Sequence, residues 1–452
     1  MPNINPATEQ ALPDHRAHSP DAVRRRIDAA SRAAHAWRTT PIASRAVLMR
    51  NAAGVLRSRA AELARLMTSE MGKPIGQSLA EIEKCAVCCE YFAQEAPRFL
   101  ATESRHTDAR RSYVRYDPLG IVLAIMPWNF PFWQVIRFAA PALMAGNVGI
   151  LKHASNVPGC ALAIEAVLRE AGLPPGAFAS LLIDSAQATA LIGDPLVRAI
   201  TLTGSDRAGR AIAQAAGRAL KKVVLELGGS DPFIVLADAN AQATAQAAAG
   251  ARCINSGQSC IAAKRFIVER PIAAAFTDAM VSHMQRLRVG DPMDSATQVG
   301  PLAREDLLRD LDDQVQRTLA AGGRLLCGGK RLDRKGFFYE PTVLGEVAPG
   351  MAAFDEETFG PVAAVMVAQD AQDAVRLANR SRFGLGAAIW TRDIERAEKL
   401  AGELEAGCVF INGTVKSDPR LPFGGVKDSG FGRELSEEGV REFVNIKTVW
   451  VG

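Results

Sequence analysis

The chain has 452 residues, of which 48% are hydrophobic, and its net charge of +4 is small beside 53 basic and 49 acidic side chains. This composition predicts a globular protein of roughly two or three domains and argues against a nucleic-acid partner or a membrane span. No leader pattern of basic and then apolar residues opens the chain, so we expect a cytoplasmic protein.

Eight cysteines are scattered along the chain, without the density of a disulfide framework or two CxxC pairs at zinc spacing. Cys85, Cys88 and Cys89 fall at helical spacing with no histidine nearby, which predicts buried side chains on one helix face. We therefore expect no metal site.

The predicted elements form two alternating series. Residues 20–100 show helical periodicity, residues 112–116 look extended, and the apolar run 120–126 predicts a strand buried on both faces. Strands then alternate with alanine-rich helices, which is typical of βαβ units in a parallel sheet. The strands are predicted at 148–152, 180–183, 199–203 and 222–226, and the helices at 157–171, 185–192 and 205–219.

A second α/β series begins at residue 232 and continues to about residue 412. The terminal segment 443–451 alternates between apolar and polar side chains, which predicts a half-buried strand. We expect this strand to pair with another subunit or with the 112–116 strand of one.

The first candidate for chemistry is Cys260, which the glycine-containing loop NSGQSC presents after an alanine-rich helix. It could be a nucleophile or a packed core side chain. His283 is the only histidine downstream, so a Cys/His hydrolase gains little support.

Glu226 is the second candidate, at the end of an apolar strand and before Gly228 and Gly229. Most strand-end glutamates are solvated or paired, but one held against apolar walls has a raised pKa and can take a proton from water near neutral pH. The two glycines permit close approach by a ligand.

Two strand-end loops complete the pattern. Asn129 follows the 120–126 strand, where its amide could donate to an oxyanion or cap the next helix. Gly204 and Ser205 open a helix whose N-terminus suits a phosphate, although neither standard nucleotide fingerprint is present. Lys152 adds a cation at the same edge of the sheet.

Together, these motifs resemble the aldehyde dehydrogenase superfamily in order and spacing over essentially the whole chain. The resemblance rests on NPAT at 5–8, PWNFP at 127–131, TGS at 203–205, ELGG at 226–229, GQSC at 257–260, EETFGP at 356–361 and PFGGVKDSGFGRE at 422–434.

The resemblance implies an α/β fold with a Rossmann-type cofactor domain, an α/β catalytic domain and a small β oligomerisation element. The implied boundaries are 1–104 with 118–227 for the NAD(P)-binding domain, 228–412 for the catalytic domain, and 105–117 with 413–452 for the oligomerisation element and C-terminal arm. A homodimer or homotetramer is expected.

The resemblance also implies residue roles. Cys260 is similar to the nucleophile, Glu226 to the general base and Asn129 to the oxyanion-binding amide, with Lys152 beside them. NAD or NADP is expected to bind to Pro127, Trp128, Lys152, His153, Ala154, Ser155, Gly204, Ser205, Leu227, Glu357 and Phe359. NAD-specific relatives commonly have a glutamate at the place of Ser155, so we expect NADP to be accepted too.

Four longer stretches carry a finer resemblance: WQVIRFAAPALMAGN at 133–147, LKHASNVPGCA at 151–161, LELGGSDPFIVL at 225–236 and FGRELSEEGVREFVNIKTVW at 431–450. Through them the chain most resembles, among members of the superfamily, bacterial succinate-semialdehyde dehydrogenases of the Sad type. Arg137 then occupies the place of an arginine that binds the substrate carboxylate, with a salt bridge to a protein carboxylate as the alternative. Ser417 lies near a substrate-binding serine. Many such enzymes have a second arginine where this chain has Ile254, and some have a redox cysteine where it has Ala262.

The alternative is a dehydrogenase of broader aldehyde specificity, with an apolar tunnel formed by Phe132, Trp133 and Phe423. A CoA-acylating enzyme fits less well because it needs no water-activating base. A binding protein that reuses the fold would be expected to lack the nucleophile or the base.

Overall fold

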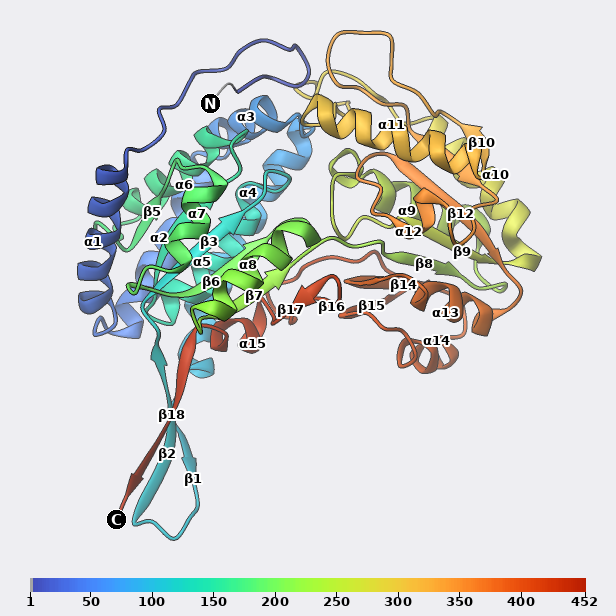
Figure 1. The fold of residues 1–452 in the computed structure, drawn as a ribbon. Coiled ribbons are helices and arrows are strands. Elements are labelled where there is room, and N and C mark those ends of the chain that lie inside the picture. Colours follow the sequence, from blue (N-terminus) through green and yellow to red (C-terminus); the bar gives the residue numbers. More distant parts are fainter. Residues whose placement is uncertain (1–2) are drawn as a thin grey trace.

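The computed structural model describes residues 3–452, and its main body contains two helix-covered sheets (Figure 1). The first sheet has the order β17-β7-β6-β3-β4-β5, and its strands are parallel except where β17 meets β7. Its strands are β3 (Ile121–Met126), β4 (Val148–His153), β5 (Phe178–Ser180), β6 (Val197–Thr203), β7 (Lys222–Glu226) and β17 (Gly430–Phe431), and its helices are α5 (Trp133–Met144), α6 (Pro158–Glu170), α7 (Ser185–Ile192) and α8 (Asp206–Arg218).

The predicted βαβ series is confirmed, with small shifts at the ends of elements. The strand predicted at 180–183 is wrong in position, because β5 pairs with Gly149–Leu151 of β4 through Phe178–Ser180. The N–H of Leu181 donates one further hydrogen bond to the Leu151 carbonyl, and the pairing with β4 ends there.

Four N-terminal helices precede this sheet in the chain: α1 (Pro20–Trp37), α2 (Ile42–Ser58), α3 (Ala60–Met71) and α4 (Ile75–Phe99). Helix α3 ends at Gly72, whose φ of +79° favours glycine and whose surroundings, Pro301 and Pro6, leave no room for a side chain. The cysteines at 85, 88 and 89 are fully buried on α4, which confirms their predicted core position.

The second sheet has the order β10-β11-β12-β9-β8-β14-β15 and carries the second α/β series. Its strands are β8 (Pro232–Val235), β9 (Arg265–Glu269), β10 (Arg324–Cys327), β11 (Thr342–Gly345), β12 (Val362–Ala368), β14 (Gly386–Trp390) and β15 (Cys408–Ile411). The accompanying helices are α9 (Ala241–Cys253), η1 (Ile254–Gly257), η2 (Arg270–Ile272), α10 (Ala273–Gln285), α11 (Glu305–Ala320), α12 (Ala352–Asp355), α13 (Ala371–Asn379) and α14 (Ile394–Ala401).

The C-terminal segment returns to the first sheet. Strand β16 (Val426–Lys427) pairs with β13 (Phe383–Gly384), and β17 then places Gly430 opposite Glu226 of β7. Helix α15 (Ser436–Arg441) follows. Residues 413–452 therefore contribute to the main body as well as to a terminal arm.

A third sheet, of order β1-β2-β18, projects from the main body (Figure 1). It contains β1 (Glu103–Arg105), β2 (Arg111–Pro118) and β18 (Val444–Val451). The terminal strand pairs antiparallel with β2 of its own chain, as the expected pairing with the 112–116 strand implied, and its other edge is not paired within residues 3–452. None of the helices in residues 3–452 has the length and apolar character needed to cross a bilayer.

Candidate active site

A cavity of about 320 Å³ lies at the carboxyl ends of β3, β6 and β7, where ligands bind in open parallel sheets. Residues of the second α/β series close its other side. It is lined by Pro127, Trp128, Asn129, Gln134, Thr203, Gly204, Ser205, Leu227, Gly228, Cys260, Arg304, Leu307, Glu357 and Phe359. Segments that are far apart in the sequence thus meet in one site.

Most of the predicted cofactor residues line this cavity, and Trp128 and Phe359 make an edge-to-face contact with ring centroids 5.8 Å apart. Ser205 begins α8 as its N-cap, with a side chain that accepts from the N–H of Ala208. The N–H of Gly204 already donates to the Glu226 carbonyl, at 3.0 Å. The helix N-terminus at Ser205 is therefore the part of this loop that suits an anion.

The remaining predicted cofactor residues follow β4 and do not line the cavity: Lys152, His153, Ala154 and Ser155. Ser155 is exposed, and burial lowers the pKa of Lys152. Both imidazole nitrogens of His153 are used within the protein, one 2.9 Å from the Pro131 carbonyl and one accepting from the Ala154 N–H. The His153 side chain is thus engaged within the protein.

Cys260 follows a strained turn. Asn255 and Ser256 have φ angles of 52° and 56°, and Gly257 has a φ of 78°. A side chain at Gly257 would collide with the Gly360 backbone, only 2.1 Å from the Cβ position. Such a turn persists when its surroundings fix it, and here it positions Cys260 in the cavity wall.

Asn129 is bonded to this turn. Its Nδ2 donates to the Gln258 carbonyl at 3.1 Å, and its own carbonyl accepts from Asn255 at 2.7 Å. Its Oδ1 accepts from Gln134, at 3.1 Å. Helix α5 has Phe132 as its N-cap, so the alternative role of Asn129 as a helix cap is wrong.

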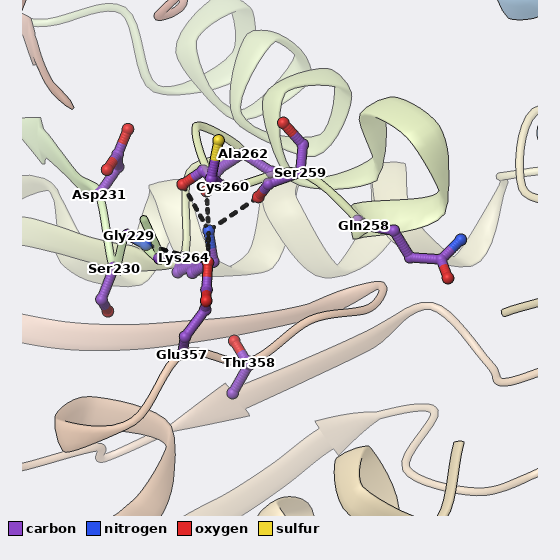
Figure 2. A network of polar contacts seen from close by, with 12 residues as sticks. Gly229, Ser230, Asp231, Gln258, Ser259, Cys260, Ala262, Lys264, Glu357 and Thr358 are labelled. Carbon is purple, nitrogen blue, oxygen red and sulfur yellow. Dashed lines mark hydrogen bonds and ion pairs between the residues drawn. The ribbon is translucent and has the colours of Figure 1, made fainter. Parts of the chain in front are cut away.

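Lys264 was not predicted, and it is central to the site (Figure 2). Its buried Nζ donates to the carbonyls of Ser259, Cys260 and Ala262 at 2.9, 2.9 and 3.1 Å. It also lies 3.6 Å from Oε1 of Glu357, which accepts from the Gly229 N–H. Its only sequence signal is a charge in an apolar stretch four residues after Cys260.

Burial and the neighbouring charges together set the pKa of Cys260. Burial raises the pKa of the Cys260 thiol to about 12, against the opposing charge of Lys264. Burial likewise raises the pKa of Glu357, and Lys264 opposes this rise. The thiol therefore needs a base before it can act as a nucleophile near neutral pH.

Glu226 lies at the buried end of β7 and does not line the cavity itself. Its carboxylate receives no well-formed hydrogen bond from the described residues, only a weaker contact from the Gly425 backbone. Burial raises its pKa to about 8, with Arg137 opposing and Glu434 adding to the rise. The predicted effect of desolvation is confirmed.

Arg137 is buried and forms an ion pair with Glu434. Its Nη2 also donates to Thr203, at 3.3 Å, and its guanidinium lies 4.9 Å from the Phe423 ring centre. A protein carboxylate therefore already neutralises Arg137, which is the salt bridge expected as the alternative to a substrate carboxylate.

The other predicted substrate-binding residues do not lie together in one site. Trp133 and Ser417 are joined by a 2.9 Å hydrogen bond, at a second cavity of about 640 Å³ that Ser417 lines. Phe132 and Phe423 are buried and line neither of these two cavities, so an apolar tunnel formed by them is not supported. Within residues 3–452, no cluster of three His, Cys, Asp or Glu side chains is placed to hold a metal ion.

Comparison with known proteins gives matches over nearly the whole chain. A sequence model of the aldehyde dehydrogenase family matches residues 1–449. A Synechocystis protein named probable succinate-semialdehyde dehydrogenase, NADP(+), is 52% identical over 448 residues, which cover 99% of each chain. The Escherichia coli protein named succinate semialdehyde dehydrogenase, NAD(P)+, Sad is 49% identical over 99% of this chain and 97% of its own.

Solved structures agree. The crystal structure of succinic semialdehyde dehydrogenase from Streptococcus pyogenes, in complex with NADP+, matches with a TM-score of 0.97 at 35% identity. The match covers 100% of this chain and 99% of that one. Because sequence and fold agree from end to end, the chain belongs to the aldehyde dehydrogenase family.

Proposed function

We propose that the chain oxidises succinate semialdehyde to succinate with NADP or NAD, through a thioester on Cys260. The observation that carries the chemistry is that Cys260 and Asn129 line one cavity, with Lys264 bonded to the Cys260 carbonyl behind it and a buried Glu226 of raised pKa nearby. The substrate is supported by the names of the relatives that are about half identical to this chain.

The cleft fits a nicotinamide dinucleotide. The N-terminus of α8 at Ser205 suits a phosphate, and the Glu357 carboxylate lines the cleft as an acceptor for a sugar hydroxyl. Lys152 and Ser155 would meet the adenosine end at the neighbouring strand. When bound, the cofactor supplies a hydride acceptor.

The residues of the chain perform the remaining steps. The Cys260 sulfur bonds to the aldehyde carbon as its proton passes through water to the solvent, so the Glu226 carboxylate remains unprotonated for the later step. The second amide hydrogen of Asn129 and the Cys260 N–H donate to the thiohemiacetal oxygen. After oxidation, water attacks the thioester, Glu226 accepts its proton, and the carboxylate product leaves as the thiol is restored.

A steady-state assay tests the proposal. We expect reduced nicotinamide to appear when the protein receives succinate semialdehyde with NADP or NAD, and Cys260→Ala to abolish it. Butanal, an uncharged aldehyde of the same chain length, should be oxidised with a lower kcat/KM. A wild-type protein that prefers butanal would instead be a dehydrogenase of broader specificity.

A further inference from the structure

Lys84 on α4 is a cation that forms no ion pair within the described residues. Its partly buried Nζ donates to the Ser417 hydroxyl at 2.9 Å and lies 3.9 Å from the Trp133 ring centre. Among residues 3–452, no carboxylate forms an ion pair with it, whereas the nearby cations Lys73 and Arg137 pair with Glu81 and Glu434. Because a partly buried charge is costly when it is not paired, this site favours an anion as the partner of Lys84.

The Ser417 hydroxyl also needs a hydrogen-bond acceptor. Lysine ammonium and indole N–H groups can only donate, so both lone pairs of the Ser417 oxygen accept, from Lys84 and from Trp133. The hydroxyl hydrogen must then point elsewhere, and no described residue accepts it. Ser417 is buried, so its free donor also needs an acceptor.

Both groups line the second cavity, of about 640 Å³. The carboxylates at its rim are already paired, Glu83 with Arg57 and Asp418 with Arg420. The exposed Lys416 adds a further positive charge. The cavity therefore favours a negatively charged ligand.

The first turn of α5 contacts residues of both this cavity and the cavity at Cys260. Trp133 bonds to Ser417 on one side, while the next residue, Gln134, lines the cleft and bonds to Asn129. Burial, and then the charge of Arg137, lowers the pKa of Lys84 to about 8, so Lys84 is mostly charged at neutral pH. The same Arg137 charge acts on the Cys260 thiol, which places Arg137 near both groups.

We propose that Lys84 and the Ser417 hydroxyl together bind the distal carboxylate of the aldehyde substrate, and that Lys84 supplies the positive charge that selects it. Arg137, neutralised by Glu434, then has a structural role. This inference rests on the proposed oxidation of succinate semialdehyde and names the residue that gives it its specificity.

The test compares substrate preference, defined as kcat/KM for succinate semialdehyde divided by that for butanal. Loss of one charge-assisted hydrogen bond corresponds to about 10- to 150-fold, so Lys84→Gln should lower the preference by that factor. The loss should appear mainly in KM for succinate semialdehyde. Lys84→Arg should restore most of the preference, and Lys399→Gln, which removes an exposed charge on α14, should leave it at the wild-type value.

The Arg137→Gln variant distinguishes the role of Arg137 from that of Lys84. It leaves the buried Glu434 without its partner, so it should lower activity on both aldehydes by similar factors and lower the melting temperature. A selective loss on succinate semialdehyde in Arg137→Gln, with an unchanged preference in Lys84→Gln, would overturn the inference in favour of Arg137.

Inhibition by succinate gives a second measurement that needs no turnover of the charged aldehyde. With butanal as substrate, Lys84→Gln should raise the inhibition constant of succinate by about 10-fold or more. If the wild type prefers butanal, the proposed function fails, and unchanged succinate inhibition in Lys84→Gln would then refute the role of Lys84 as well. If the wild type prefers succinate semialdehyde and Lys84→Gln keeps that preference, this inference alone fails.

Discussion

At the scale of single residues, surroundings decide what a carboxylate can do. Glu226 and Glu434 are both buried and both near Arg137, yet only Glu434 pairs with it. Glu226 keeps a pKa of about 8, so it can exchange a proton with water.

Replacement of Glu226 should separate acylation from deacylation. Because hydrolysis of the thioester needs the base, Glu226→Gln should still give a burst of reduced cofactor near one equivalent per site and then stall. Rapid-mixing measurements of the absorbance of the reduced cofactor check the size of the burst. Steady turnover at the wild-type rate would show that another group activates water.

The same carboxylate predicts a pH profile. A base works in its deprotonated form, and burial raises the pKa of Glu226, so wild-type turnover limited by deacylation should rise with pH through about 8. The slow residual turnover of Glu226→Gln should lack this rise. A wild-type profile that is flat between about pH 7 and 9 would contradict the assignment.

Ser155 tests the choice of cofactor. It is exposed after β4, and a carboxylate at this place would repel the 2′-phosphate of NADP. We expect Ser155→Glu to raise KM for NADP by about 10-fold or more relative to NAD. Ser155→Gln, of the same size without the charge, is the control, and equal effects of the two variants would exclude repulsion.

At the scale of elements, Lys264 joins two segments that are far apart in the sequence. It stands immediately before β9, holds three carbonyls of the Cys260 loop and faces Glu357 after α12 (Figure 2). One ammonium therefore fixes the nucleophile loop against a residue of the cofactor cleft.

Removal of this ammonium should loosen both segments. Lys264→Met removes a donor from three buried carbonyls and the ion-pair partner of the Glu357 carboxylate, at a cost of about 3–5 kcal/mol. We expect a lower melting temperature and weaker cofactor binding, measured by tryptophan fluorescence, to which Trp128 in the cleft contributes. Lys399→Met is the exposed control, and cofactor binding of wild-type strength in Lys264→Met would refute a positioning role.

At the scale of the whole molecule, the β1-β2-β18 sheet presents an edge and apolar side chains. Strand β18 lies at the edge of this sheet, and Ile446 and Trp450, four residues apart on one face, are 62% and 56% exposed. Such surfaces are typical of subunit contacts. We propose that this sheet forms the interface of a homodimer or homotetramer.

Charges on that face should dissociate the assembly. We expect the double variant Ile446→Lys and Trp450→Lys to elute with the mass of a smaller oligomer in size-exclusion chromatography with light scattering. Asn445→Lys adds a charge to the opposite face of the same strand and should keep the wild-type mass. An unchanged mass in the double variant would place the interface elsewhere.

Much of the fold and part of the site could be predicted from the sequence. Short apolar runs between alanine-rich helices predicted the βαβ series, because strands buried on both faces are apolar along their whole length. The raised pKa of Glu226 could be predicted because this carboxylate stands at the end of an apolar strand. Lys84 and Lys264 were missed, because a lysine on a helix or before a strand looks like an ordinary solvated charge until its neighbours are known.

The sequence by itself determined the family, the order of the strands along the chain and the residues that meet at the sheet edge, since these depend on local patterns and motif spacing. Only the tertiary structure decided which charges are compensated. Arg137 and Glu434 are 297 residues apart in the chain yet pair, whereas Lys84 meets Ser417 but no carboxylate. Electrostatic energy depends on distance in space and on burial, and neither can be read from separation along the chain.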